Sequence, residues 1–330
     1  GGNAASESAV ALALAWLAAH QRRDGSWRFD FDGEPCNDQC GNPGTVGATN
    51  AATGLALLPF LGAGHTHMEG EYRDVVHRGL YYLKDAMVMT PDGGDLHQQT
   101  MYAQGIATIA LCEAVAMSDD ETFRVAAQRA VDFIANAQHS KGGWRYLPRH
   151  PGDTTVFGWQ MMALKSAHMA GLDVPSPTLS LAERFLDSVQ SGDGAYYGYM
   201  TPDESPGPTA IGLLIRMYTG WRRDVTPLSK GVAYLAKKGP SESDMYYNYY
   251  ATQVLHHYGG EAWPKWNEQL RDYLIRTQAA AGHERGSWFF VDKHGSRGGR
   301  LYTTAMCAMI LEVYYRHMPL YGRSAVEENM

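Results

Sequence analysis

The sequence lacks the features that mark nucleic-acid-binding and membrane-spanning proteins. It has no dense run of Lys or Arg, and its 28 basic residues are outnumbered by 35 acidic ones, giving a net charge of −7. A nucleic-acid groove or a patch for anionic membranes needs clustered basic charge, so we expect no nucleic-acid partner. No apolar run approaches the roughly 18–20 residues that span a bilayer, so we expect no transmembrane segment.

Cysteine is also scarce, because four residues are too few for a disulfide scaffold in a chain of 330. Cys112 and Cys307 lie in apolar helical patterns and are expected to be buried hydrophobic residues. Cys36 and Cys40 lie in a loop, where they could form a disulfide, remain free thiols or contribute half of a metal site. No His or Cys companion is obvious, so we expect no metal and no other cofactor, with these two cysteines as the weak candidates.

The start of the chain carries no signal-peptide pattern. It reads Gly1-Gly2-Asn3 and looks trimmed, so the compartment stays open, and an extracytoplasmic domain of a longer bacterial protein is one option. Apolar residues are plentiful, since 45% of the chain is hydrophobic and only 19% is charged. This composition is sufficient for a large core, and a repeat architecture can accommodate 330 residues in one domain.

A spaced Gln, Gly and aromatic residue recurs along the chain. In the clearest copy, FIANAQHSKGGW, Gln138 is followed by Gly142 and Trp144. The pattern recurs in stronger or weaker form at Gln21, Gln190 and Gln278, and after Tyr82-Leu83 and Tyr234-Leu235. Copies at a spacing of roughly 50 residues indicate stacked supersecondary units. We interpret the Gln, Gly and Trp as a clasp between repeats on the outside of the protein, remote from any active site.

Each repeat holds two helical patterns, an amphipathic one before the Gln and a far more apolar one after a Gly/Pro/Asp loop. The predicted helical hairpins span approximately residues 5–64, 71–118, 121–171, 177–220, 225–260 and 263–318. No long stretch alternates with period two, so little or no β-sheet is expected. Neither terminal apolar helix looks capped, which favours closure into a ring over an open solenoid. The sequence therefore predicts an all-α, monomeric (α/α)6 toroid, with the apolar helices inside, forming one domain over residues 1–330.

The spaced Gln, Gly and Trp resemble the QW motif of squalene-hopene cyclases and other triterpene cyclases. More broadly, the chain resembles the prenyltransferase/squalene-oxidase repeat group of α-α toroids over essentially its whole length. It is most similar to bacterial proteins described by that repeat, whose typical strings match residues 142–146, 152–166 and 245–253. The resemblance implies a terpenoid-cyclase-like fold, but it does not imply an activity, because toroids host unrelated functions.

The catalytic signatures of these families are absent. Class II cyclases use an acidic Asp-x-Asp-Asp-Thr-Ala motif, and the matching residues 205–210 read Ser-Pro-Gly-Pro-Thr-Ala. Prenyltransferases bind zinc through Asp, Cys and His. The resemblance would place these ligands at Asp153, Thr155 and Tyr247, so two of the three are missing. A thioester like that of complement-like toroids is a further option for Cys36, because a Gln follows it three residues later.

Inner helices of a ring direct their amino ends toward one end of the axis, which is the default ligand site. The catalytic candidates there are Asp153, Asp244, Tyr247, Tyr302 and His97. The ligand-binding candidates are Gln99, Tyr102, Trp159, Gln160, Tyr246, Tyr250 and Arg300. The structural alternatives are that the two Asp residues cap helices, that the tyrosines pack the core, and that His97 is a solvated loop residue. Arg297 and Arg300 could clamp an anion or pair with acidic groups.

These residues favour a ligand-binding or scaffold domain that uses its axial cavity for a small molecule, lipid or glycan. One alternative is a polysaccharide lyase-like enzyme acting on acidic glycans. It would use Tyr247 or Tyr302 as the base, His97 as its partner and Arg300 as the carboxylate clamp. The other alternative is a divergent terpene cyclase or prenyltransferase-like enzyme.

Overall fold

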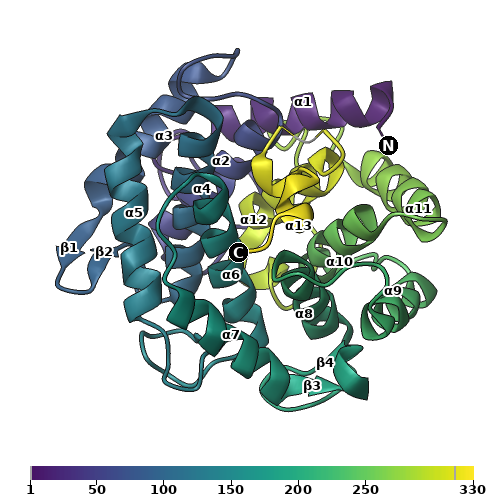
Figure 1. Cartoon of the computed structure of the whole chain (residues 1–330). Coiled ribbons are helices and arrows are strands. Elements are labelled where there is room, and N and C mark those ends of the chain that lie inside the picture. The colour runs from purple at the N-terminus through teal and green to yellow at the C-terminus, as the bar shows by residue number, and fades with distance from the viewer. Residues whose placement is uncertain (1, 316) are drawn as a thin grey trace.

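A computed structural model of the chain describes residues 2–315 and 317–330. Helices dominate these residues and form two concentric layers (Figure 1). The inner helices are α2 (Thr49–Gly62), α4 (Met101–Ser118), α6 (Thr154–Met169), α8 (Pro206–Tyr218), α10 (Met245–Tyr258) and α12 (Gly295–Glu312). The outer helices are α1 (Ala4–Ala19), α3 (Arg73–Ala86), α5 (Glu121–Asn136), α7 (Ser176–Val189), α9 (Thr226–Lys238) and α11 (Ala262–Thr277).

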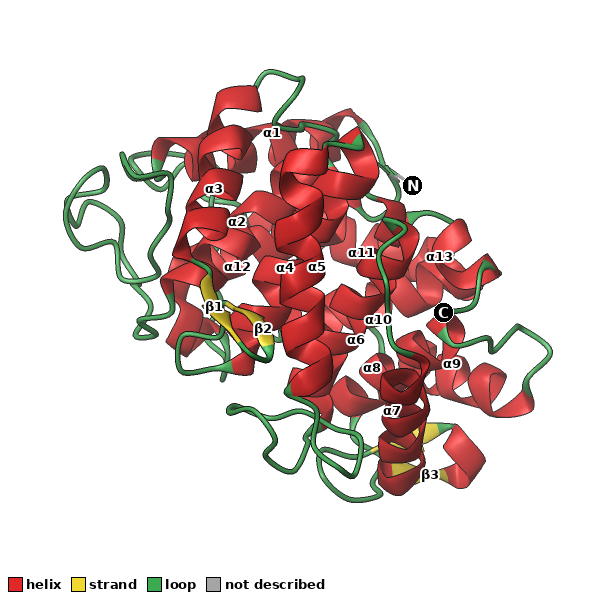
Figure 2. Ribbon diagram, turned by 60° about the vertical axis from the view of Figure 1, so that its left-hand side comes forward, coloured by secondary structure: helices red, strands yellow, loops and turns green. Residues whose placement is uncertain are grey.

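The inner helices pack against one another in chain order, and α12 closes the ring against α2. Outer helix α1 likewise contacts α11, the last outer helix. The predicted all-α (α/α)6 toroid is confirmed. The only strands among the described residues form two small antiparallel ribbons, visible in Figure 2. They pair β1 (Val88–Thr90) with β2 (Gly93–Asp95), and β3 (Gln190–Ser191) with β4 (Tyr196–Tyr197).

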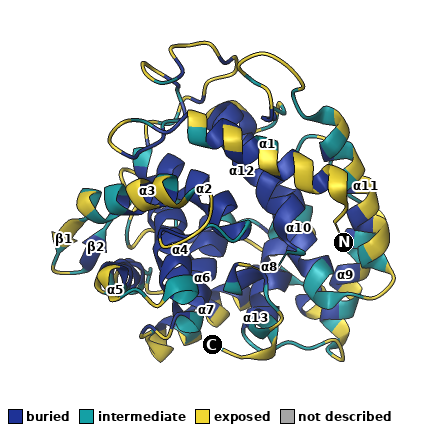
Figure 3. Ribbon diagram, turned by 90° about the horizontal axis from the view of Figure 1, so that it is seen from above, coloured by how far each residue is buried: buried dark blue, intermediate teal, exposed yellow. Residues whose placement is uncertain are grey.

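Burial separates the two layers as the hydrophobic patterns predict. Inner helix α4 is buried over nearly its whole surface, whereas outer α3 buries one stripe that includes Val76, Leu80 and Leu83. Figure 3 shows the same contrast, with exposed residues on the outward faces of the outer helices. By length and composition alone α4 could cross a membrane, which the sequence-based search for apolar runs did not detect. In the toroid it packs between α2 and α6.

The recurring Gln, Gly and Trp join neighbouring outer helices. The Gln138 carboxamide donates to Gly142 O at 2.9 Å and to Thr178 O, in the next outer helix, at 3.0 Å. The indole of Trp144, in the loop after α5, donates at 2.8 Å to Ile134 O near the end of α5. The same bonds recur at two further copies. In one, which contains Trp27, Gln21 donates to Val75 O, and in the other, which contains Trp288, Gln278 donates to Ala9 O. We call these three sets the clasps, and the last of them joins α11 to α1.

The glycine of the clasp is required by close approach as well as by its backbone angle. Gly142 has a φ of 96°, and a Cβ at this position would lie 1.7 Å from Leu181 O in the neighbouring helix. Gly25 and Gly286 occupy the equivalent positions, with φ of 90° and 93°, and each faces a backbone carbonyl of the next outer helix. A side chain here would push the two helices apart.

The C-terminal segment closes the end of the ring at which the inner helices finish. A short 3-10 helix, η2 (Pro319–Tyr321), lies against α4 and α6, and α13 (Ser324–Glu327) lies against α8. Leu320 and Tyr321 are fully buried, and Figure 1 shows the C-terminus near the centre of the ring. The predicted hairpins, which end at residue 318, did not include this plug.

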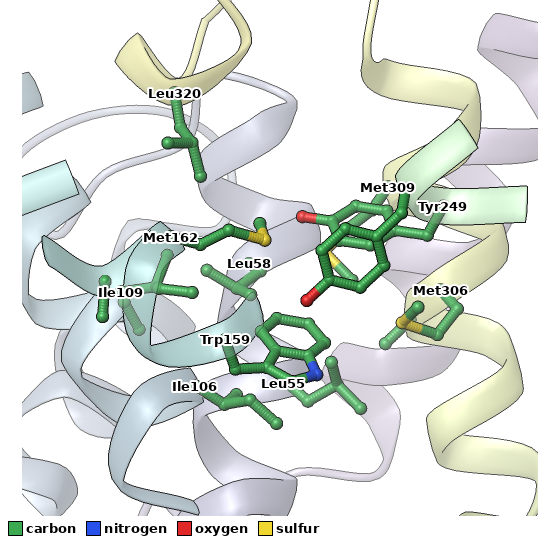
Figure 4. Packing of buried hydrophobic residues seen from close by; sticks show 14 of the residues in the cluster. Leu55, Leu58, Ile106, Ile109, Trp159, Met162, Tyr249, Met306, Met309 and Leu320 are labelled. Carbon is green, nitrogen blue, oxygen red and sulfur yellow. The ribbon is translucent and has the colours of Figure 1, made fainter. Parts of the chain in front are cut away.

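Side chains also fill the middle of the axis. Trp159 stacks on Tyr249 with ring centroids 5.8 Å apart, and Met306 and Met309 surround them (Figure 4). An open channel through the ring is therefore absent from the described residues.

Replacing Trp144 by Ala should lower the free energy of unfolding by about 3–5 kcal/mol, because the indole is buried and its hydrogen bond would be lost. Urea unfolding monitored by circular dichroism measures this change. Trp263→Ala, at a half-buried site in α11, serves as the control and should cost less. A loss below about 1 kcal/mol for Trp144→Ala would show that the clasp does not stabilise the ring.

Glu113 lies wholly buried beneath the C-terminal plug, where Ser166 Oγ donates to it at 2.5 Å. Burial raises the pKa of Glu113 to about 7. The folded pKa is therefore higher than the unfolded one, so its stabilising contribution is complete below about pH 4.5 and is lost as the pH rises to about 7.

Glu113→Gln keeps the acceptor for Ser166 without the charge. The free energy of unfolding of this variant minus that of the unsubstituted protein should be about 3 kcal/mol larger at pH 8 than at pH 4.5. Urea unfolding at both pH values tests this, with the exposed Glu183→Gln as a control that should show no such gain. The same stability difference for Glu113→Gln at both pH values would refute the raised pKa.

Candidate functional site

A cavity of about 310 Å³ lies at the amino ends of the inner helices. Its deeper wall is apolar and aromatic. Its polar groups come from the first turns of the inner helices and from the loops that precede these helices. Its lining consists of Phe29, Val46, Ala51, Leu55, Gln99, Thr100, Tyr102, Ile106, Tyr146, Trp159, Tyr246, His294, Arg297, Gly298 and Tyr302. Figure 4 shows Leu55, Ile106 and Trp159 together, where the cavity meets the packed axis.

Two tyrosines of the wall are fixed by the first turn of α6. Tyr102 donates its hydroxyl to Thr155 Oγ1 at 2.8 Å, and Tyr246 donates to Thr155 O at 2.7 Å. The ring of Tyr246 also stacks on His294 at 4.4 Å between centroids. In contrast, the buried hydroxyl of Tyr302 has no hydrogen-bond partner among the described residues.

The cavity has little capacity for acid–base chemistry at neutral pH. Burial raises the pKa of Tyr302 and of Tyr246 well above the ordinary value, so both phenols stay protonated. Burial also lowers the pKa of His294 below 6.5, which keeps the imidazole neutral at pH 7. Arg297, exposed at the mouth, is therefore the cationic side chain of the lining, which includes no Asp or Glu among the described residues.

Five of the candidates from the sequence line the cavity: Gln99, Tyr102, Trp159, Tyr246 and Tyr302. Gln160 and Tyr250 lie behind the wall. The carboxamide of Gln160 donates to Met101 O at 2.7 Å, and Tyr250 packs edge-on against Trp159. These two residues support the wall without lining the cavity.

Of the residues predicted for a lyase, Tyr302 lines the cavity, but Tyr247, His97 and Arg300 lie outside its lining. His97 pairs with Asp95 at 2.6 Å, and the Tyr247 hydroxyl donates to Gly239 O at 3.1 Å, outside the lining. Arg300 pairs with Glu284 at 3.0 Å at the junction of the first and last repeats. The combination of Tyr247, His97 and Arg300 around one substrate is wrong, because the fold separates these side chains.

Both Asp candidates cap helices. Asp153 is fully buried and accepts from Thr155 N at 3.0 Å and from Val156 N at 2.9 Å. Asp244 accepts from Tyr247 N at 2.9 Å at the start of α10. Neither carboxylate lines the cavity.

Sequence reasoning missed His294, Tyr146, Phe29 and Val46 as lining residues. All four precede inner helices in loops, where hydrophobic periodicity carries no information. His294 immediately precedes α12, and Tyr146 lies two residues after the clasp residue Trp144. Their sequence positions relative to the last inner helix and to the clasp could therefore have indicated them as lining residues.

The expectation that Cys36 and Cys40 lack companions is wrong. Both are free thiols, and the fold brings them beside His20 and His283. The four potential ligand atoms all lie within 4.8 Å of one another. His283 was missed because it is separated from the cysteines by most of the chain, and His20, although it lies in the same segment between α1 and α2, carries no spacing pattern that links it to them.

A second cleft, of about 830 Å³, lies at the carboxyl ends of α8 and α10 beside the C-terminal segment. Its lining includes several charged side chains, of which Arg222 donates to Glu327 O at 2.9 Å and to Asn329 Oδ1 at 2.7 Å. The cavity at the amino ends, which combines an apolar wall with the unpaired Tyr302 hydroxyl, is the stronger candidate for a ligand site.

No protein-family model and no curated protein matches the sequence. Solved structures match it over nearly their whole length. A type II terpene cyclase from Scytonema, in complex with geranylgeranyl dihydroxybenzoate, has a TM-score of 0.62 at 13% identity, covering 95% of this chain and 98% of its own. An α-1,6-mannanase from Salegentibacter, in complex with α-1,6-mannotriose, has a TM-score of 0.62 at 8% identity, covering 93% and 98%.

A GH76 α-mannanase from Bacteroides thetaiotaomicron matches similarly, with a TM-score of 0.64 at 12% identity over 94% of this chain and 96% of its own. The chain is thus an α/α toroid, similar in fold to terpenoid cyclases as the sequence predicted, and equally similar to glycan-acting enzymes. At such low identity the likeness establishes the fold alone.

Proposed function

We propose that the protein binds a small amphiphilic molecule in the cavity at the amino ends of the inner helices and does not transform it. The ligand has an apolar body and an anionic head group. The observation that carries this proposal is a lining that combines a deep apolar and aromatic wall with one cation at the mouth and no carboxylate. At about 310 Å³ the cavity is at the small end of the range for ligand pockets.

The wall orients such a ligand by polarity. Leu55, Ile106 and Trp159 offer an apolar surface where the cavity meets the packed axis. Arg297 at the mouth and the unpaired Tyr302 hydroxyl can contact the head group. Each hydrogen bond to a charged group contributes about 1.5–3 kcal/mol, and burying the body contributes in proportion to its apolar area.

The enzymatic alternatives receive less support. Glycoside hydrolysis uses two carboxylates that flank the scissile bond, and no lining residue of the described cavity is acidic. A lyase needs a base, but the pKa of Tyr302 is raised by burial, which keeps the proton on its hydroxyl. The same lack of a lining carboxylate leaves a cyclase without its acid.

Matched probes test the proposal: decanesulfonate with decanol, and naphthalenesulfonate with naphthol, titrated by isothermal calorimetry. At least one sulfonate should bind, and Arg297→Gln should weaken its binding at least tenfold while changing that of its neutral partner little. Arg184→Gln, an exposed substitution on α7, should leave both unchanged. Ile106→Trp fills the cavity and should abolish binding in protein that remains folded.

Mass spectrometry of the probes after incubation gives the second readout. The proposal predicts intact probes and a co-purifying amphiphile in extracts of the purified protein. Absence of binding for every probe and every extract would contradict it, as would turnover of a bound ligand.

Sulfonate binding should also depend on pH through His294. Burial holds the pKa of His294 below 6.5, so the ring is neutral at pH 7.5 and becomes cationic as the pH falls through that lowered pKa. A sulfonate stays ionised over this range, so its affinity should rise toward acidic pH while that of the alcohol does not. His294→Gln should remove the dependence, and an unchanged pH profile in this variant would exclude His294 as its source.

A further inference from the structure

Four side chains with metal-binding atoms meet where the first and last repeats join. His20 follows α1, Cys36 and Cys40 lie in the loop before α2, and His283 lies in the loop before α12. Cys40 Sγ is 3.1 Å from His283 Nδ1 and 3.4 Å from His20 Nε2, and Cys36 Sγ is 4.0 Å from His283 Nδ1.

These separations suit a tetrahedral metal ion. With zinc–sulfur bonds of about 2.3 Å and zinc–nitrogen bonds of about 2.0–2.1 Å, neighbouring ligand atoms lie about 3.2–3.8 Å apart. The observed distances fall close to this range, so a bound ion requires only small side-chain adjustments. Two thiolates and two imidazoles are a donor set that selects zinc among the common divalent ions.

His20 is already oriented for this role. Its Nδ1 lies 2.7 Å from Trp16 O, so the proton on Nδ1 donates to that carbonyl and Nε2 faces Cys40 with its lone pair. The ring stacks on Trp16 at 3.9 Å and packs near Phe31, in an apolar shell that excludes water. A metal-ligating histidine usually has such a backbone partner on its second nitrogen.

Three of the four potential ligands are buried, and the fourth faces solvent. His20, Cys36 and Cys40 are buried, whereas His283 is exposed. An ion can therefore reach the site from solvent through movement of the His283 side chain.

We propose that His20, Cys36, Cys40 and His283 bind one zinc ion in a closed Cys2His2 site with a structural role. Binding converts both thiols to thiolates and releases their protons to solvent, with no change of oxidation state. All four positions are filled by protein, so the ion has no open position for a substrate.

The surrounding contacts explain what the ion stabilises. Glu284, next to His283, accepts from Gly41 N at 2.7 Å and pairs with Arg300, which in turn donates to Asn42 Oδ1 at 3.0 Å. Thr45 N then donates to Arg297 O at 2.7 Å, at the mouth of the cavity. Zinc would thus fix the closure of the ring together with the loop that leads to the ligand site.

The test begins with metal content and cobalt substitution. Purified protein loaded with zinc should hold one ion per chain by plasma mass spectrometry. The cobalt form should show visible bands of tetrahedral cobalt with thiolate-to-cobalt charge transfer. His283→Asn should lower the affinity at least tenfold, and Cys40→Ser should weaken the charge-transfer band. The control is His139→Asn, because His139 lies three residues before the clasp glycine Gly142, as His283 does before Gly286, and this variant should leave binding unchanged.

Stability supplies a second readout that does not depend on the spectrum. A chelator should lower the melting temperature of the zinc-loaded protein but not that of Cys36→Ser or Cys40→Ser. Substoichiometric zinc after loading, or a Cys36–Cys40 disulfide in freshly purified protein, would overturn the proposal. Unchanged cobalt affinity in His283→Asn would also overturn the four-ligand site.

Discussion

In each clasp, one glutamine carboxamide bridges two neighbouring outer helices and fixes their spacing, on which the ring depends. In each of the three clasps it donates to a carbonyl of its own loop and to one in the next outer helix. Each bond contributes only about 1 kcal/mol, but the buried Trp and the close glycine fix the same geometry. The third clasp, from Gln278 to Ala9, connects residues from opposite ends of the chain and closes the ring.

Closure of the ring gives its two ends different roles. The C-terminal segment covers the carboxyl ends of the inner helices, with Tyr321 fully buried, and Trp159 and Tyr249 fill the axis. The amino ends remain, and their preceding loops converge there with Arg297 and His294. The cavity thus follows from the architecture, while its chemistry follows from the loops, which explains how one fold serves cyclases, glycan-acting enzymes and this chain.

The sequence predicts the ring because its signals are periodic and local. The spacing of Gln138, Gly142 and Trp144, together with alternating amphipathic and apolar helices, indicates six helical pairs. The roles of Asp153 and Asp244 as helix caps were also among the predicted alternatives. The C-terminal plug, the separation of His97 from Arg300, and the meeting of His283 with Cys40 depend on contacts between distant segments. No local pattern encodes such contacts, so only the three-dimensional structure reveals them.

The central claim is that one amphiphilic ligand occupies the cavity with its head group at the mouth. A crystal structure of the protein soaked with decanesulfonate tests it most directly. The account predicts a sulfonate beside Arg297 and Tyr302, with the alkyl chain against Ile106 and Trp159. A fully occupied ligand in the cleft between α8 and α10, with the cavity at the amino ends empty, would contradict it.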